Sequence, residues 1–348
     1  MTHVAILTGG GDCPGLNAVI RAVTRRSISA HECLVSGVRD GWRGLIEDDL
    51  APLSLARIRG ILPLGGTILG TTRTNPFNEP DGAGRIMETV RTHGIDAVVA
   101  IGGEDTLGVA LRLHQEFGLN VVGVPKTIDN DLSGTDYTFG FDTAVQIATE
   151  AVDRLHTTAE AHNRVMVVEV MGRHTGWIAV MAGIAGGADV VLIPEFPMAV
   201  EDVCDLLQQR AARGKRFSIV VVSEGAALSW RAGREETVLL SDDVDAFGHV
   251  RLGGVGSVLA KEIERIAGIE ARVTILGYVQ RGGTPTSRDR VLATRYGVKA
   301  AEMVQAGEWG RMAALRGDSI ESCPLTEALE AVKTVPPALY EVARTFFG

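Results

Sequence analysis

Short apolar runs alternate along the chain with longer segments in which apolar residues recur at helical spacing. The apolar runs are typical of strands and lie at residues 4–7, 34–38, 97–102, 120–125, 164–170, 189–194, 217–225 and 271–278. Several lack the apolar–polar alternation of half-exposed strands, as expected for parallel strands covered on both faces. Helical patterns fill the intervals at residues 15–29, 83–93, 106–117, 142–160, 174–184, 199–213, 255–267 and 288–306. The repeated strand–helix–strand order predicts an α/β fold with doubly wound, mostly parallel sheets.

The length of the chain indicates more than one domain, although no linker marks a boundary. With 348 residues, the chain exceeds the usual size of a single core and suits two domains. Its 45% hydrophobic and 22% charged residues are those of an ordinary globular protein. No low-complexity segment or repeat of fixed period interrupts the alternation, so we expect the domain boundary to lie inside it.

Charge, cysteine content and the N-terminus limit the classes of function. A net charge of −9 argues against a general nucleic-acid or membrane surface. The four cysteines are scattered without a CxxC pair, which favours the reducing cytoplasm over a disulfide framework or a zinc site. The N-terminal apolar run meets glycines at once, unlike a signal peptide. Residues 177–193 are apolar, but their glycines and Asp189 indicate a buried helix running into a strand rather than a membrane span.

The segments that follow the predicted strands hold the candidate chemistry, because ligands of open α/β sheets bind beyond the carboxyl ends of the strands. After the first strand comes TGGGDCPG, in which Gly10 and Gly11 would let backbone N–H groups approach an anion. The loop fits neither the Walker A nor the GxGxxG spacing. A tight strand-to-helix turn without a ligand is the alternative.

Acidic residues follow two further strands, in GGEDT and PKTIDND. Because Mg²⁺ takes one or two carboxylates plus phosphate oxygens, Glu104 is a candidate metal ligand; a solvated acidic turn is the alternative. Lys126 adds a cation. Asp129 and Asp131 are spaced to point to one side of an extended segment, where one could accept a proton from an attacking hydroxyl and the other orient it or hold metal. An Asx turn is the alternative for this pair.

Three later strand ends carry charged residues suited to phosphates and sugars. Arg173 ends VVEVMGR and could clamp a phosphate or neutralise charge in a transition state. Glu224 in VVVSEGA could accept hydrogen bonds from sugar hydroxyls, and Arg281 stands beside a glycine pair in LGYVQRGGTPTSRDR. So many charged or glycine-rich strand ends together favour a ligand site over ordinary turns.

In order along the chain, LTGGGDCPGLNAVIR, IGGEDT, PKTIDND, GTDYTFGFDTA, VVEVMGR, IPE and LGYVQRGGTPTSRDR resemble the phosphofructokinase family. The resemblance covers essentially the whole chain. It implies transfer of a phosphoryl group, with Mg²⁺, to the 1-hydroxyl of fructose 6-phosphate in glycolysis or gluconeogenesis. It also implies two α/β domains interleaved in sequence: a phosphoryl-donor domain of residues 1–139 plus about 254–307, and a sugar-phosphate domain of about 140–253 plus 308–348.

Carried over residue by residue, the resemblance assigns the phosphoryl-transfer chemistry. Asp129 matches the family's catalytic base, and Thr127 and Asp131 support it. Arg173 matches the arginine that touches the sugar phosphate and the transition state. Arg73 in GTTRT matches a ligand of the phosphoryl donor.

The remaining matches concern the sugar phosphate and a neighbouring subunit. Glu224 matches the acceptor of sugar hydroxyls, and Arg281 matches a sugar-phosphate ligand. Arg164 and Arg272 match arginines that reach the sugar phosphate across a subunit interface, which implies a homo-oligomer (dimer or tetramer) with shared sites. Tyr278 stands where many ATP-using members have histidine. The other expected substrate contacts are Gly10, Gly11, Thr127, Ile128, Asp129, Met171, Gly172, Val279 and Gln280.

Two departures from the family pattern bear on the phosphoryl donor. ATP-using relatives typically read GGDGS where this chain has GGEDT, so Glu104 takes the metal-ligand place and Asp105 replaces a glycine that leaves room for the α-phosphate of a nucleotide. They read GTIDND where this chain has KTIDND, so Lys126 brings a cation able to hold a short anion. Some ATP-using relatives keep the lysine, which makes Asp105 the more discriminating residue. The pair resembles the pyrophosphate-dependent branch, and pyrophosphate is the expected donor.

Other functions stay open from the sequence. An ATP-dependent 6-phosphofructokinase is the nearest alternative, and sedoheptulose 7-phosphate is an alternative acceptor. NAD kinase has a similar GGDGT-like loop but would not explain VVEVMGR or GYVQRGG, and a dehydrogenase would need GxGxxG. A non-catalytic sugar-phosphate sensor is disfavoured because the base, the metal acid and the arginines are all present.

Allosteric control is expected to be weak or absent. The family's basic effector pocket is matched in part, but two of its basic or polar residues are replaced. The matching residues are Arg21, Arg25, Arg213 and Lys215, and the replacements are His156 and Phe217.

Overall fold

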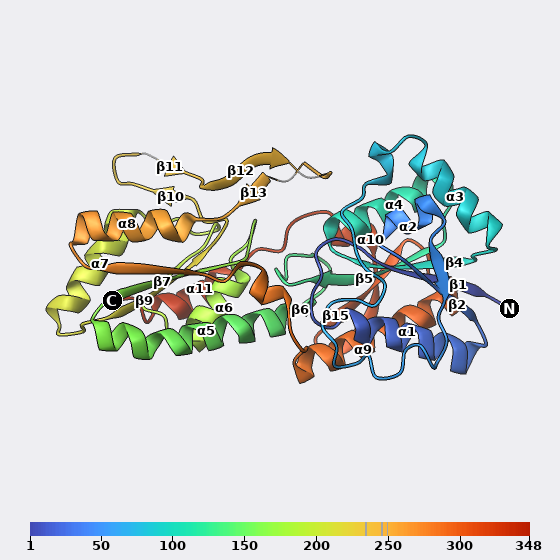
Figure 1. The fold of residues 1–348 in the computed structure, drawn as a ribbon, viewed down its shortest axis with the longest axis horizontal. Helices are drawn as coiled ribbons and strands as arrows, with labels where there is room; N and C mark the ends of the chain where they lie inside the picture. The colour runs from blue at the N-terminus through green and yellow to red at the C-terminus, as the bar shows by residue number, and fades with distance from the viewer. Residues whose placement is uncertain (234, 245, 249) are drawn as a thin grey trace. The chain divides into compact units, whose positions relative to one another are not determined.

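The structure, a computed structural model, describes residues 1–233, 235–244, 246–248 and 250–348 (Figure 1). The chain forms two compact units that interleave in sequence. Unit 1 consists of Met1–Asp142, Asp245–His249 and Arg281–Val332, and unit 2 consists of Thr143–Val244, Val250–Gln280 and Lys333–Gly348.

Unit 1 is built on a mostly parallel sheet with the strand order β16-β15-β5-β4-β1-β2-β3, and β6 pairs with β5. Its strands are β1 (His3–Thr8), β2 (Leu34–Val38), β3 (Leu50–Pro52), β4 (Ala97–Gly102), β5 (Val121–Thr127), β6 (Phe139–Gly140), β15 (Arg311–Arg316) and β16 (Ser319–Pro324). Only the outer pairs β2–β3 and β15–β16 are antiparallel among the described strands of this sheet. The central β4 is buried along its whole length, which explains its uninterrupted apolar sequence.

Helices cover both faces of the unit 1 sheet (Figure 1). On one face lie α1 (Leu16–His31) and α9 (Ser287–Ala306), which pack against each other. On the other face lie α2 (Trp42–Glu47), η1 (Pro76–Asn78), α3 (Gly82–Thr92), α4 (Glu104–Phe117) and α10 (Leu325–Ala328). Their apolar side chains form one core with the sheet, for example Ile86, Leu107 and Leu325 against Leu7 and Val98.

Unit 2 contains a parallel sheet in the order β14-β7-β9-β8. Its strands are β7 (Val165–Val170), β8 (Val190–Leu192), β9 (Ser218–Ser223) and β14 (Ala271–Ile275). One face is covered by α7 (Val200–Ala212) and α8 (Val255–Ala267), and the other by α5 (Phe141–His162), α6 (Trp177–Ala185) and α11 (Pro337–Arg344) (Figure 1). The remaining elements are η2 (Gly277–Arg281) and the short ladders β10 (Leu228–Ser229) with β11 (Glu235–Glu236) and β12 (Leu239–Val244) with β13 (Val250–Leu252).

The predicted fold class is confirmed, and each predicted strand and helix occurs within a few residues of its expected place. Residues 177–193 indeed form a helix, α6, that is followed by β8. The elements without a prediction are short or lie near the C-terminus: α2, β3, η1, β6, the two small ladders, η2, the β15–β16 hairpin, α10 and α11.

The two units interleave in sequence, with boundaries that differ from those the sequence suggests. The family resemblance implies that about 254–307 belong to the first domain and 308–348 to the second. In the structure β14 pairs with β7, with Ala271 opposite Val165, so α8 and β14 belong to unit 2. The strand β15 pairs with β5, with Arg311 opposite Val122, so residues up to Val332 belong to unit 1.

Candidate active site

The expected donor-site residues of unit 1 gather at the carboxyl ends of three adjacent parallel strands, β1, β4 and β5. The chain leaves β1 toward β2 on one side, while β4 lies on the other side, so the sheet changes direction between β1 and β4. Ligands of open α/β sheets bind in the crevice at such a switch point. Both glycine loops, after β1 and after β4, begin there, and Gly9 N–H donates to Ile101 O at 3.0 Å.

The loop after β1 requires glycine because other groups approach its backbone closely. Gly10 has φ +77°, which favours glycine, and a Cβ added to it would lie 3.4 Å from Lys126 Nζ. A Cβ on Gly11 would lie 2.6 Å from Arg281 Nη1. Arg281 Nη1 also donates to Asp12 O at 3.2 Å. Two cations therefore lie directly against this loop, as an anion site requires.

Lys126, the penultimate residue of β5, is buried with only 4% of its surface exposed. Its Nζ donates to Gly11 O at 2.5 Å. Burial lowers the pKa of this ammonium from the ordinary 10.5 to about 8, and the nearby Arg281 and Arg73 also lower it. Arg73 follows Thr72, whose carbonyl accepts from Gly10 N–H at 3.1 Å. The structure thus brings all three predicted cations to the same glycine loop.

Glu104 and Asp105 are the first two residues of α4, which begins two residues earlier than the predicted helix. Glu104 is exposed and Asp105 is half-buried. The preceding Gly103 provides no side-chain cap, so the carboxylates stabilise the positive end of the helix dipole. The acid pair therefore lies at the start of a helix and not in the solvated turn that was the alternative interpretation.

The segment after β5 holds Asp129 in a fixed turn. Asp129 is half-buried, and its N–H donates to Thr127 Oγ1 at 3.0 Å. Asn130 has φ 51°, and its Oδ1 accepts from Thr138 N–H at 3.1 Å. Ile128, between Thr127 and Asp129, is fully buried, so its side chain is not available to a ligand. Asp131 is half-buried.

In unit 2 the segment after β7, which carries Met171, Gly172 and Arg173, lies against the segment after β9. Gly172 has φ +139°, and its carbonyl accepts from Ser223 Oγ at 2.7 Å and from Gly225 N–H at 3.0 Å. A Cβ on Gly225 would lie 1.9 Å from Arg173 O. The backbone around Arg173 is therefore tightly fixed beside the strand-end acid, Glu224.

Ser223 and Gly225 are positions that the sequence analysis missed. They flank Glu224 in the SEGA segment. The small residue on each side of a strand-end acid was the feature of the sequence that could have indicated them. Their contacts with the backbone of Gly172 and Arg173 are non-local, so spacing alone does not reveal them.

The three predicted residues after β14 differ sharply in exposure. Tyr278 is 82% exposed and Val279 is 66% exposed, whereas Gln280 is fully buried. The Gln280 side chain accepts from Met171 N–H at 3.3 Å and donates to Gly277 O at 3.2 Å. Its amide therefore contacts the protein backbone at the start of the Arg173 segment.

Arg164 and Arg272 lie at the opposite end of the unit 2 sheet. Arg164 directly precedes β7, and Arg272 is the second residue of β14. Both contact Glu270; the Arg164 pair measures 2.9 Å. The six residues of β7 span about 20 Å, so within one chain these arginines are far from Arg173.

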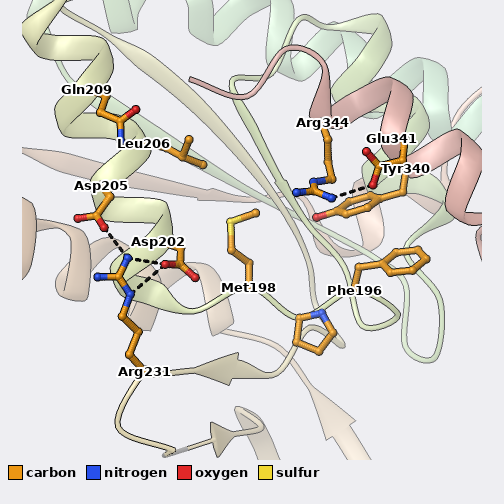
Figure 2. Close-up of a pocket in the computed structure, with 11 residues that line it drawn as sticks. Phe196, Met198, Asp202, Asp205, Leu206, Gln209, Arg231, Tyr340, Glu341 and Arg344 are labelled. Carbon is orange, nitrogen blue, oxygen red and sulfur yellow. Dashed lines mark hydrogen bonds and ion pairs between the residues drawn. The ribbon is translucent and has the colours of Figure 1, made fainter.

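Two surface cavities of unit 2 contain none of the expected substrate-binding residues. The larger, of about 550 Å³, lies between α7 and α11; Figure 2 shows Met198 and Arg231 on one side and Phe196 and Tyr340 on the other.

The smaller cavity, of about 380 Å³, includes Lys215 from the expected effector pocket together with Asp189 and Arg210. Asp189 and Arg210 pair at 2.7 Å, and both side chains are largely buried. Nearby, His156 stacks edge-on against Phe217, with ring centroids 5.9 Å apart. Arg210, one of the two cations that line this cavity, is thus paired with a carboxylate within the chain.

The part of the chain that the structure describes contains neither a preformed metal site nor a membrane-spanning helix. No three His, Cys, Asp or Glu side chains there come together as a ready-made metal site. None of the described helices combines the length and apolar character needed to cross a bilayer.

Comparison with known proteins gives consistent results along the whole chain. Residues 3–304 match the family model for phosphofructokinase. A Streptomyces coelicolor protein named pyrophosphate–fructose 6-phosphate 1-phosphotransferase is 58% identical over 345 residues, 99% of each chain. Another from the same organism, named ATP-dependent 6-phosphofructokinase 3, is 53% identical over 341 residues, 98% of each chain. A solved structure of a pyrophosphate-dependent phosphofructokinase from Marinobacter aquaeolei superposes with TM-score 0.81 at 25% identity, over 100% of this chain and 92% of that one.

Proposed function

The chain belongs to the phosphofructokinase family, and we propose that it transfers a phosphoryl group from pyrophosphate to the 1-hydroxyl of fructose 6-phosphate. The products are fructose 1,6-bisphosphate and phosphate, and the reaction is reversible. The choice of pyrophosphate as donor rests on Asp105, which lies in the first turn of α4, and on Lys126, which is buried at the neighbouring glycine loop.

Unit 1 supplies the donor site. Gly10 and Gly11 let the pyrophosphate oxygens approach backbone N–H groups, and Lys126 and Arg73 balance their charge. Asp105 excludes a nucleotide by placing a negative charge and a side chain where an α-phosphate would extend. Pyrophosphate ends before that point.

Mg²⁺ fits the donor set of this site. An exposed carboxylate, Glu104, lies at the same sheet edge as the glycine loop, and Mg²⁺ needs only one or two carboxylates when substrate phosphates complete its coordination. Glu104 would hold the ion. Bound Mg²⁺ would neutralise part of the charge on the transferred phosphoryl group.

Asp129 is the general base. Its carboxylate accepts the proton of the sugar 1-hydroxyl as that oxygen attacks the terminal phosphorus of pyrophosphate, and the bond to the bridging oxygen breaks to release phosphate. Thr127 fixes the backbone of Asp129 through the 3.0 Å hydrogen bond, and Asp131 orients the acceptor. Arg173 neutralises charge that develops in the transition state.

Unit 2 supplies most of the sugar-phosphate site. Glu224 accepts from sugar hydroxyls, Met171 and Gly172 line the sugar beside Arg173, and Tyr278 and Val279 flank it. Arg281, which belongs to unit 1, binds the sugar phosphate. The protein acts in the cytoplasm, in keeping with its scattered cysteines.

Arg164 and Arg272 serve the sugar phosphate of a neighbouring subunit, so the active species is a homo-oligomer. The exposed edge strand β14 and the segment after it support this assignment. Ile275 is 50% exposed there, and the exposed Tyr278 and Val279 follow it closely in the chain. Exposed apolar residues on and beside an edge strand are typical of an interface.

Mixing two inactive variants tests the shared site. An Arg164→Ala chain retains Asp129, and an Asp129→Asn chain retains Arg164. Hybrid oligomers of the two should therefore regain part of the activity, because some sites receive both intact residues. A fully active monomer in analytical ultracentrifugation would contradict the shared site.

The acceptor is tested by a matrix of sugar phosphates with pyrophosphate and Mg²⁺, in which ³¹P NMR identifies each product. Fructose 6-phosphate should be converted to the 1,6-bisphosphate, and sedoheptulose 7-phosphate serves as the larger comparison. Absence of turnover with both sugars, despite tight sugar-phosphate binding, would instead identify a sensor.

A further inference from the structure

The loop of residues 171–176 joins β7 to α6 and carries Arg173. Its first half is held by Gln280, Ser223 and Gly225, as described above. Its second half ends at Gly176, which precedes α6 and provides no side-chain cap. The backbone N–H groups at a helix start need acceptors from elsewhere, so the end of this loop depends on a group outside it.

Glu195 supplies that acceptor. Its Oε2 and Oε1 accept from Gly176 N–H at 3.0 and 3.2 Å. Glu195 belongs to the IPE segment just after β8, in a tight turn in which Ile193 bridges to Phe196. A Cβ on Gly176 would lie 2.1 Å from Ile193 Cγ2, so the loop and the turn are in direct contact. A carboxylate at a helix N-terminus is also favoured by the helix dipole.

The same carboxylate binds the C-terminal segment, residues 333–348. Glu195 Oε1 accepts from Val335 N–H at 3.0 Å, and Trp177 Nε1 donates to Lys333 O at 2.8 Å. The next residue of the turn, Phe196, stacks on Tyr340 of α11 with centroids 4.8 Å apart, and both rings lie on one side of the cavity in Figure 2. Glu195 therefore joins three separate parts of unit 2.

We propose that Glu195 is a positioning residue that fixes the end of the 171–176 loop, and with it Arg173, by joining the loop to the C-terminal segment. The proposal rests on the proposed function, in which Arg173 lies beside the sugar and neutralises charge that develops in the transition state. Glu195 itself touches no substrate. The IPE segment is part of the family resemblance, but the proposed mechanism gives it no role. Holding the 171–176 loop in place is such a role.

Glu195→Gln tests the proposal with minimal change of shape. The amide has one acceptor oxygen, and its NH₂ group would face an N–H donor of Gly176 or Val335. We expect kcat/KM for fructose 6-phosphate to fall about 10- to 100-fold, since small misplacement of a catalytic group has effects of this order. The KM for pyrophosphate, which depends on unit 1 residues, should not change.

The matched control is Glu341→Gln, which neutralises an exposed carboxylate in the same C-terminal segment, where Glu341 pairs with Arg344 at 2.7 Å. It should match the wild type in both substrates. Trp177→Phe is the milder second variant, because it removes the hydrogen bond to Lys333 O and leaves both hydrogen bonds of Glu195 in place. It should show a smaller loss in the same direction as Glu195→Gln.

Amide hydrogen exchange at residues 171–177 provides a readout that does not depend on activity. The Glu195→Gln and Trp177→Phe variants should exchange faster there than the wild type and Glu341→Gln. Unchanged exchange, a loss shared by Glu341→Gln, a raised KM for pyrophosphate, or faster exchange with wild-type kinetics would each overturn the positioning role. A wild type without turnover would refute the proposed function instead, and unchanged exchange in the variants would still overturn the positioning role.

Discussion

Replacing Lys126 by Met removes the one buried cation that the account assigns to pyrophosphate, while keeping a side chain of similar length. Lys126 is only 4% exposed, and its Nζ donates to Gly11 O at 2.5 Å. Truncating one partner of a buried charged hydrogen bond typically costs about 2–5 kcal/mol. We therefore expect kcat/KM for pyrophosphate to fall about 30-fold or more, without any gain in ATP use because Asp105 remains.

The same residue predicts the pH dependence of the wild type. Burial lowers the Lys126 pKa to about 8, Arg281 and Arg73 lower it as well, and Cys13 and Asp12 act in the opposite direction. Since kcat/KM reports the ionisation of the free enzyme, the ammonium fraction and the wild-type kcat/KM should fall about tenfold from pH 7 to pH 9. Pyrophosphate also ionises in this range, and the Lys126→Met profile provides the correction. Parallel profiles for the two proteins would refute the assignment.

The pH dependence of the free energy of unfolding tests the lowered pKa of Lys126 independently of activity. The pKa of Lys126 is depressed from 10.5 to about 8, so between these values the unfolded chain binds more protons than the folded chain. The free energy of unfolding should therefore rise with pH from about 8 to 10.5, by up to about 3 kcal/mol. The Lys126→Met variant should lack this rise in urea denaturation at pH 7.5 and 10. A rise of equal size in both proteins would contradict the buried charge.

Three further predictions follow from the proposed site. Asp129→Asn should lower turnover by about 10²–10⁴-fold, as expected for loss of a general base, with sugar-phosphate binding by calorimetry nearly intact; a loss of less than about tenfold would rule out the base assignment. Asp105→Gly should weaken pyrophosphate use modestly and permit detectable ATP use, because a carboxylate about 4 Å from an α-phosphate repels it by roughly 1–4 kcal/mol. The variant should also lose about 0.5–1 kcal/mol of stability from the first turn of α4. ADP and phosphoenolpyruvate should have little effect on rate; strong activation or inhibition at physiological concentrations would overturn this.

The central strands could be predicted because a strand that is buried on both faces consists of an uninterrupted run of apolar residues. The strand β4 is apolar along its whole length and is buried throughout. By contrast, β15 and β16 form a hairpin through Gly317 and Asp318, and neither strand has a long apolar run. The unit to which each C-terminal segment belongs depends on pairing with strands more than a hundred residues away. No local pattern records such pairing.

For the candidate site, too, the features that depend on local sequence could be predicted, and the contacts between distant segments could not. Strand ends with glycine, acid or arginine were visible in the sequence, and the structure brings Gly11, Lys126 and Arg281 together. The burial of Gln280 and its hydrogen bond to Met171 were not predictable, because the motif does not show which way a side chain points. The start of α4 at Glu104 was also missed, since an acid pair suits a turn as well as a helix start.

The proposed donor specificity is tested most directly by measuring the activity of the unmodified protein with each of the two donors. Purified enzyme, Mg²⁺ and fructose 6-phosphate are combined with either pyrophosphate or ATP at equal concentration, and the initial rate of fructose 1,6-bisphosphate formation is measured. We expect rapid turnover with pyrophosphate and little or none with ATP, because Asp105 stands where the nucleotide's α-phosphate would lie. Efficient turnover with ATP while pyrophosphate is inert would contradict the proposed donor specificity.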